Sequence, residues 1–482
     1  MKREYPFNLL TEYLIDAYNI DTNESYQIES INARDLIVPE RIDIMAKWAY
    51  IDCHVNNVDK SNAIEMYTAH LDAFSYGSFI EPGNERKNSI ERYLKIFDEL
   101  IEDILYNGFD EKKSIIPVGK NGEILDGSHR VAIAAYFNMG VTVIRFPKIE
   151  RNFGTDFFRK NLLNSNYLNT MVTQYLAIKE NCYFACLWPI SYNLTKLNTI
   201  KEIISNYGKI IHIQEIELNY NGLKNFMSQI YKHQSWVGTY ENNFSGVNSK
   251  AKACFLKSKP MRTIVFHAKC LEDVLEIKKQ IRDLYQLQNH SIHISDNDEE
   301  SRQMAQLLYN KNSLHHLNYG KPCSHLEIQR QINVIKKMIK NEEIDDKNLI
   351  IGKDGSMAIY GIDEFKEITE INIGNRTVSY EELTTNIQDK VYCNHPTNAV
   401  CFSSHNYFIY DGIKFIALSK IIENKNIKRE EEKLIKHFIK KQSKSFFSEE
   451  RILEYERKHK LYRVGLLSNK DYIILRIKNI FK

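Results

Sequence analysis

The stretch "IIPVGKNGEILDGSHRVAIAAYF", residues 115–137, contains two short apolar runs joined by a Lys-Asn-Gly turn, then a polar loop and an apolar segment. This pattern predicts a strand, a hairpin turn, a second strand and a helix over 131–139. The loop Asp126–Arg130 stands where the chain enters that helix. Because the first N–H groups of a helix lack partners and its dipole is positive there, we predict an anion site at this loop.

Each residue of the loop suits the binding of phosphate. Gly127 allows close approach of the backbone, Ser128 can donate to a phosphate oxygen, and Arg130 can hold two oxygens at once. Asp126 can accept a hydroxyl proton or help to hold Mg²⁺. The alternative is that Asp126 and Ser128 only cap the helix, which leaves His129 and Arg130 without a purpose.

This segment resembles the ParB/sulfiredoxin superfamily, whose members carry a strand, a DG-x-HR-like loop and an Ala-rich helix. The resemblance covers roughly 75–150. It implies binding of ATP or another nucleotide by Gly127, Ser128, His129 and Arg130, with Mg²⁺ at Asp126. Ser128 stands where sulfiredoxins have a reactive cysteine, and no helix-turn-helix follows as in DNA partition proteins. The branch of small-molecule kinases therefore fits best.

Such kinases also need a carboxylate near the acceptor hydroxyl. The nearest upstream candidates are Glu81 and Glu85 in "FIEPGNERK", and Lys87 in the same stretch can meet a phosphate. We expect Asp126, Glu81, Glu85 and His129 to be the catalytic residues. The alternative reading of the three upstream residues is that they are solvated loop charges.

Further along, hydrophobic periodicity predicts strands and helices in the order βαββαβ between 183 and 310, with helices covering one face of an antiparallel sheet. Within it, "NHSIHISDNDEESRQMAQLLY" resembles the active-site segment of nucleoside diphosphate kinases, which share a ferredoxin-like core. In that family a histidine at the place of His293 carries the phosphoryl group, and Ser295, Asp296 and Glu299 match neighbouring positions. These residues form a possible second site.

The first strand of this region ends in Leu187-Trp188-Pro189, where the family has a lysine. We therefore expect His293 to have a structural or substrate-binding role, with hydrogen bonds to buried neighbours such as Ser295.

The C-terminal stretch "IIGKDGSMAIYGIDEFKEITEINI" resembles the nucleotidyltransferase fold, in which a Gly-Ser turn precedes an Asp-x-Asp pair that binds two metal ions. Gly355 and Ser356 form the turn here, but Glu367 and Thr369 stand at the pair. Asp411 is a candidate third acid. Because threonine cannot replace a bridging carboxylate, we expect a degenerate domain used for binding or structure.

The composition fits a multidomain α+β protein. The chain has 482 residues, 43% hydrophobic and 26% charged, with a formal net charge of +3. That charge argues against a nucleic-acid binder, and no apolar run approaches the roughly 18 residues of a membrane helix. No signal peptide pattern is visible, so we expect a cytoplasmic location. The predicted divisions are a helical segment at 1–75, a phosphate-binding domain at 76–150, a ferredoxin-like domain at 180–320, a nucleotidyltransferase-like domain at 324–445 and a tail at 446–482.

Together these features predict a nucleotide-dependent phosphotransferase acting on a small hydroxylated acceptor such as a sugar or an amino acid. The combination of domains resembles accessory proteins of surface-glycan synthesis, which suggests that role for the acceptor. The alternatives are a metal-dependent nucleotidyltransferase and a non-catalytic nucleotide-binding scaffold or sensor. The sequence leaves the oligomeric state open.

Overall fold

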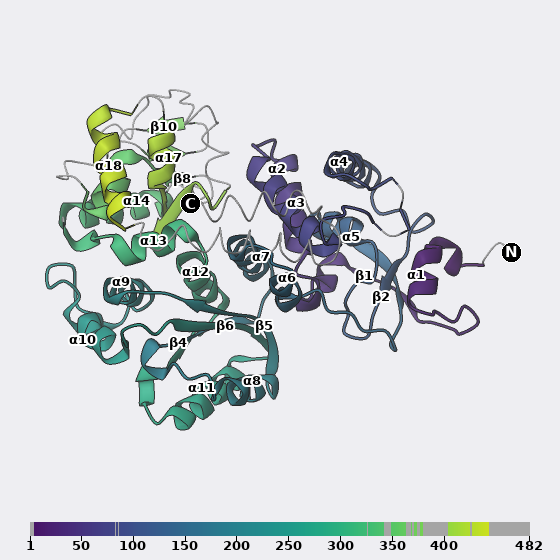
Figure 1. Cartoon of the computed structure of the whole chain (residues 1–482), viewed down its shortest axis with the longest axis horizontal. Coiled ribbons are helices and arrows are strands. Elements are labelled where there is room, and N and C mark those ends of the chain that lie inside the picture. Colours follow the sequence, from purple (N-terminus) through teal and green to yellow (C-terminus); the bar gives the residue numbers. More distant parts are fainter. Residues whose placement is uncertain are drawn as a thin grey trace, which may run out of the picture. The chain divides into compact units, whose positions relative to one another are not determined.

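The computed structural model describes residues 4–81, 83–84, 86–324, 326–341, 349–362, 368, 371–373, 376–378, 403–424 and 427–442. The chain divides into two compact units (Figure 1). Unit 1 comprises Met1–Val172 together with Phe446–Lys482, and unit 2 comprises Thr173–Ser445. The predicted tail at 446–482 lies outside the described residues. Both units combine helices with small sheets, which confirms the predicted α+β class.

Unit 1 is built on a three-stranded sheet in the order β1-β3-β2. Strand β1 (Ile28–Asn32) is antiparallel to β3 (Gly140–Arg145), which is parallel to β2 (Ile116–Val118). A bridge between Val118 and Ile124 closes the predicted Lys-Asn-Gly hairpin. The sequence predicted a helical segment at 1–75, and β1, which lies within that range, belongs to the same sheet as the strands that flank the loop.

The helices of unit 1 pack around this sheet. Local sequence sets both ends of helix α4, because Ser89 accepts a hydrogen bond from the Arg92 N–H and Gly108 follows the last turn with a φ of 75°. Among the described residues its helices are α1 (Glu12–Ala17), α2 (Ile44–Val55), α3 (Ser61–Ser75), α4 (Ile90–Asn107), α5 (Ser128–Tyr136) and α6 (Thr155–Lys160). Helix α7 (Ser165–Ile178) begins in unit 1 and ends in unit 2. Helix α5 packs against both α2 and α4, so these three helices position the loop that precedes α5.

Unit 2 begins with a four-stranded antiparallel sheet in the order β5-β6-β4-β7. Its elements follow the chain as β4 (Cys182–Leu187), α8 (Leu197–Ser205), β5 (Gly208–Ile216), α9 (Tyr220–Ile230), α10 (Ser245–Cys254), β6 (Met261–Ala268), α11 (Leu271–Tyr285), β7 (Ile292–Ile294) and α12 (Asp298–Leu308). These strands and their principal helices follow the predicted βαββαβ order. Helix α10 is an insertion that the sequence did not indicate.

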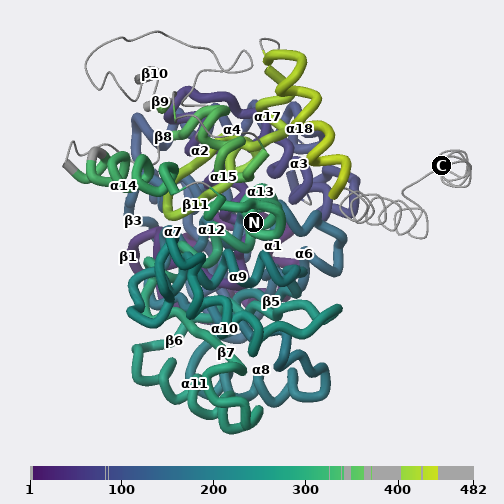
Figure 2. Tube along the Cα trace, turned by 90° about the vertical axis from the view of Figure 1, so that its left-hand side faces the viewer, coloured from purple at the N-terminus to yellow at the C-terminus, as the bar shows by residue number. Residues whose placement is uncertain are grey.

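Helices cover both faces of this sheet, whereas the sequence predicted one covered face. Helices α8 and α11 pack their apolar side chains on one face, and Figures 1 and 2 show α9 and α12 on the other. All six residues of β4 are buried, as expected for a strand between two layers.

The second sheet of unit 2 has five strands in the order β10-β9-β8-β12-β11. Only β8 and β12 are parallel neighbours. The strands are β8 (Leu349–Ile351), β9 (Ile371–Ile373), β10 (Arg376–Val378), β11 (Tyr407–Tyr410) and β12 (Ile413–Ile416). The helices are α13 (Lys311–Tyr319), α14 (Leu326–Asn341), α15 (Lys353–Tyr360), α17 (Leu418–Glu423) and α18 (Arg429–Gln442).

Candidate functional sites

The loop before α5 adopts the geometry of a helix start with open N–H groups. Gly127 caps the helix in the left-handed region with a φ of 83°. The Val131 N–H makes the bond to the Gly127 carbonyl at 3.0 Å, so the N–H groups of Ser128, His129 and Arg130 precede the first turn of helical hydrogen bonds. A Cβ at position 127 would lie 2.8 Å from Arg130 Nη2, so both the backbone angle and the packing require glycine.

Three half-buried side chains surround this helix start, namely Asp126, Ser128 and Arg130. Asp126 Oδ1 accepts a hydrogen bond from the Gly127 N–H at 2.6 Å. The Arg130 guanidinium donates to the Ser114 hydroxyl, and its Nη2 lies 3.9 Å from Asp126 Oδ2. A guanidinium has five N–H donors, so Arg130 keeps donors for a further acceptor while Ser114 fixes its direction.

His129 points away from solvent, into the core beneath the loop. Its Nε2 lies 2.6 Å from the Tyr67 hydroxyl, and its ring packs edge-on against Phe97 with centroids 4.8 Å apart. Burial, helped by the charge of Lys87, lowers the pKa of His129 well below its ordinary value. The ring is therefore neutral, and its Nε2 can accept a hydrogen bond from the Tyr67 hydroxyl. The sequence suggested a catalytic and phosphate-binding imidazole, but these contacts fit a residue that positions the loop.

A buried chain of charged groups lies behind His129, and the sequence analysis missed it. Asp43 is held by Arg41 Nε and by Lys47 Nζ, each at 2.8 Å, and Lys47 Nζ lies 3.2 Å from His70 Nε2. Burial, together with the charge of Lys47, lowers the pKa of His70 to about 3. His70 Nδ1 then donates to the Tyr67 carbonyl, at 2.6 Å. The only signal in the sequence was the Asp43–Lys47 spacing of four, which also occurs on exposed helix faces.

Glu81 and Lys87, two of the predicted upstream residues, come together as an ion pair at 2.7 Å. The Lys87 side chain is only 12% exposed, and its Nζ lies 5.4 Å from the centre of the Tyr93 ring, which neighbours His129. The structure therefore brings Glu81 and Lys87 close to the base of the loop. Glu85 lies outside the described residues.

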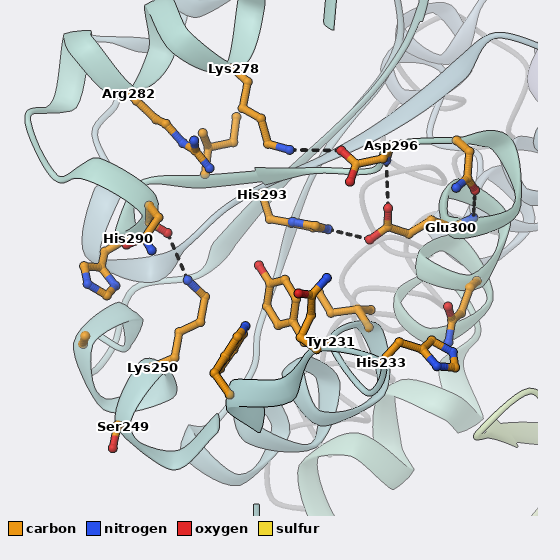
Figure 3. A pocket seen from close by; sticks show the side chains of 18 of the residues that line it. Tyr231, His233, Ser249, Lys250, Lys278, Arg282, His290, His293, Asp296 and Glu300 are labelled. Carbon is orange, nitrogen blue, oxygen red and sulfur yellow. Dashed lines mark hydrogen bonds and ion pairs between the residues drawn. The ribbon is translucent and has the colours of Figure 1, made fainter. Parts of the chain in front are cut away.

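Unit 2 contains a pocket of about 910 Å³ lined by residues of α10, α11, β7 and α12 and by the segment that follows α9 (Figure 3). Its lining includes His293, which the sequence singled out, and the aromatic side chains Tyr231 and Trp236. The charged residues of the lining are Lys250, Lys278, Arg282, Asp296, Glu299 and Glu300. A volume of this size is sufficient for a small-molecule ligand.

His293 and Glu300 form a hydrogen-bonded pair in this pocket, with Nε2 and Oε1 at 2.9 Å. The Asp296 N–H donates to the other oxygen of Glu300 at 2.7 Å. Burial opposes ionisation of Glu300, but the hydrogen bond and charge of His293 keep the pKa of its carboxyl below the usual value. Because an ionised carboxylate can only accept, His293 donates its Nε2–H to Glu300. The resemblance in sequence pointed to Glu299, whereas the carboxylate bonded to His293 belongs to the next residue, Glu300.

The other two residues of the predicted second site have different roles. Asp296 lies in the pocket wall, with an exposed carboxylate 3.2 Å from Lys278 Nζ. Ser295 is buried, where its hydroxyl accepts from the Phe184 N–H at 2.9 Å and lies 2.7 Å from the Ser301 hydroxyl. Ser295 thus ties β7 to β4 and is not the partner of His293 that the sequence suggested.

The C-terminal candidates are structural where the structure describes them. Gly355 and Ser356 lie inside α15 instead of forming a turn, and Ser356 is fully buried. Asp411 is in the turn between β11 and β12, where it pairs with Lys232 at 2.7 Å and with Lys336. Glu367 and Thr369 lie outside the described residues.

Within the described ranges, no group of three or more His, Cys, Asp or Glu side chains is arranged to hold a metal ion. None of the helices described is both long and apolar enough to cross a membrane. Comparisons with known protein families, with curated proteins and with solved structures found no match to this chain.

Proposed function

We propose that this chain is a nucleotide-dependent phosphotransferase that holds phosphate oxygens at the start of α5. The observation that carries the proposal is the helix start itself. Its first N–H groups follow a left-handed glycine, and the half-buried side chains of Asp126, Ser128 and Arg130 surround them. Helix starts bind phosphate because their N–H groups and dipole favour negative charge. Arg130 adds a charged, directional donor.

The remaining groups suit transfer of a phosphoryl group to a hydroxyl. Glu81 would take the proton of the acceptor hydroxyl, and the oxygen of that hydroxyl would bond to the γ-phosphorus of ATP. The bond from the γ-phosphorus to the β–γ bridging oxygen would break, which releases ADP. Lys87, paired with Glu81, would neutralise charge on the phosphates. Glu85 belongs to the same upstream set in this proposal.

Asp126 is the residue that would hold Mg²⁺. One of its oxygens accepts from the Gly127 N–H and the other lies 3.9 Å from Arg130, so lone pairs remain on both. Magnesium usually takes one or two protein carboxylates and completes its shell with water and substrate phosphates, which fits a single aspartate. When bound, the ion would neutralise charge on the nucleotide phosphates.

The finer fold assignments belong to the same proposal. Residues 76–150 would be the ParB/sulfiredoxin-like part, 180–320 the ferredoxin-like part and 324–445 the nucleotidyltransferase-like part. The strand order β5-β6-β4-β7, connected as βαββαβ, supports the second assignment. The acceptor would be a small hydroxylated molecule such as a sugar or an amino acid, used in surface-glycan synthesis.

Calorimetric titration of the full chain with ATP, ADP and CTP in the presence of Mg²⁺ tests the phosphate loop. Arg130→Gln should weaken nucleotide binding at least tenfold, since a charge-assisted hydrogen bond contributes roughly 1.5–3 kcal/mol. Lys113→Gln is the matched control, because it removes an exposed positive charge that is paired with Asp110 and lies outside the loop. Unchanged affinity in a folded Arg130→Gln protein would overturn the proposal.

Turnover with pooled alcohols and labelled ATP then identifies the reaction class. Formation of ADP and a phosphorylated alcohol, without pyrophosphate, supports the phosphotransferase. Release of pyrophosphate supports a nucleotidyltransferase, and binding without turnover supports a nucleotide sensor or scaffold. Either of the last two results would replace the proposed activity.

A further inference from the structure

The pocket around His293 has a cationic end formed by Lys250 and Arg282. Figure 3 shows both side chains, with His290, on the side of the pocket away from Asp296 and Glu300. Burial lowers the pKa of Lys250, and the nearby positive charge of Arg282 acts in the same direction. The two cations therefore share one region of the pocket and repel each other there.

Neither cation has an acidic partner within the part of the chain that the structure describes. The Lys250 ammonium donates to the carbonyl of Asn289 at 3.1 Å, and Arg282 Nε is buried without a hydrogen-bond partner among the described residues. Lys278, the third cation of the lining, is already paired with Asp296. Because uncompensated buried charge is unfavourable, a bound anion would stabilise this end of the pocket.

The opposite end presents hydrogen-bond acceptors. A carboxylate offers about four lone-pair positions, and the described contacts use two on Glu300 and one on Asp296. Acceptors grouped in this way suit the hydroxyl groups of a ligand. They also repel additional negative charge, which argues against a polyphosphate that extends across the pocket.

An apolar surface lies between these two ends. The rings of Tyr231 and Trp236 have centroids 5.2 Å apart, and Tyr231 also packs edge-on against His293 at 5.0 Å. Trp236 is 41% exposed, which is high for so large an apolar side chain on a pocket wall. The Lys250 ammonium lies over both rings, at 5.5 and 5.9 Å. The rings thus offer a flat surface beside the cationic end, against which the carbon face of a small ring can pack.

We propose that this pocket binds the phosphate monoester of a hydroxylated ring compound, such as a sugar phosphate. Lys250 and Arg282 hold the phosphate dianion, whose two charges they match. Asp296 and Glu300 accept hydrogen bonds from the hydroxyl groups, and the ring packs on Tyr231 and Trp236. The site uses no residue of the loop at Asp126–Arg130, so it goes beyond the proposed phosphotransfer and does not depend on it.

Calorimetry of the full chain with pentose and hexose monophosphates, free glucose, inorganic phosphate and ATP tests this site. At least one sugar monophosphate should bind tenfold or more tightly than inorganic phosphate or glucose, and tenfold or more tightly than ATP when the Arg130→Gln protein is titrated. Arg282→Gln and Lys250→Gln should each weaken that binding at least tenfold. Asp296→Asn should weaken sugar phosphate binding while leaving inorganic phosphate unaffected. Lys279→Gln is the matched control on α11, because Lys279 is exposed and does not line the pocket.

Two outcomes would overturn the proposal. One is that no sugar monophosphate binds more tightly than inorganic phosphate, or that ATP binds best to the Arg130→Gln protein, in which the proposed N-terminal nucleotide site is weakened. The other is that a folded Arg282→Gln protein, checked by circular dichroism, keeps the wild-type affinity. Repeating the titration with Arg130→Gln separates the two sites, since this variant should bind the sugar phosphate like the wild type whether or not the N-terminal loop binds nucleotides.

Discussion

The hydrogen bond between Tyr67 and His129 gives a direct test of how the loop before α5 is held. Tyr67 is fully buried and its hydroxyl lies 2.6 Å from His129 Nε2. Tyr67→Phe removes the donor and leaves a buried ring nitrogen without its partner. The net loss of a neutral hydrogen bond is about 1 kcal/mol, and a buried acceptor left unsatisfied costs about 1–3 kcal/mol. We therefore expect the free energy of unfolding of unit 1 to fall by about 1–3 kcal/mol.

For a folding unit of this size, such a loss lowers the melting temperature by roughly 2–4 °C per kcal/mol. Thermal unfolding of the full chain, followed by calorimetry and by tryptophan fluorescence, measures the shift. Tyr93→Phe is the matched control, because the Tyr93 ring also packs near His129 but its hydroxyl does not bond to it. If Tyr67→Phe melts within 1 °C of Tyr93→Phe, the hydrogen bond does not hold His129 and the positioning role assigned to it is wrong.

Three further predictions concern buried polar groups. His70 and His129 are neutral in the folded protein, because burial lowers the pKa of His70 to about 3 and the pKa of His129 well below its ordinary value. In the unfolded chain a histidine has a pKa of about 6.5, so below this pH the unfolded chain binds more protons than the folded protein. Stability should therefore fall as the pH drops from 6.5 towards 4, and His70→Gln should reduce the slope of unfolding free energy against pH by about 1.4 kcal/mol per unit; an unchanged slope contradicts this. Ser356→Ala should be neutral or stabilising by up to about 1 kcal/mol in urea unfolding, because its buried hydroxyl has no hydrogen-bond partner among the described residues, and a clear loss of stability would show that the hydroxyl has a bound partner. Asp411→Asn should lower the free energy of unfolding by about 1–3 kcal/mol in the same assay, because Lys232 and Lys336 lose the carboxylate that they share. Asparagine tolerates the φ of 50° at this position, so the backbone should be unaffected. Wild-type stability would show that these ion pairs contribute little.

Elements governed by local chemistry could be predicted closely. Helix α4 begins after Ser89 and ends before Gly108 because a hydroxyl cap and a left-handed glycine are sufficient to set both ends. Helix α11 (Leu271–Tyr285) is likewise governed by local sequence, since its apolar residues repeat with helical spacing. Strong alternation and helical periodicity in succession were also sufficient for the βαββαβ order of the first sheet in unit 2.

Pairings between distant segments could not be predicted. Strand β1 pairs with β3 across more than 100 residues, and no local pattern in 28–32 distinguishes it from a loop beside a helix. The buried polar chain from Arg41 to His70 could not be predicted, because spacing alone does not reveal burial. For the same reason the sequence could not distinguish a catalytic His129 from one packed beneath its loop.

The sequence by itself determined the composition of each candidate site, namely the loop residues Asp126–Arg130 and the strand that carries His293. The tertiary structure alone decided which other groups join them. Lys250 lies on α10 and Arg282 on α11, and β6 separates these two helices in the sequence. Glu300 lies in the first turn of α12, the helix that follows the strand of His293. The physical reason is that side-chain convergence depends on how helices pack on a sheet. That packing is set by apolar contacts among many distant residues, whereas capping, turns and periodicity act over only a few neighbours.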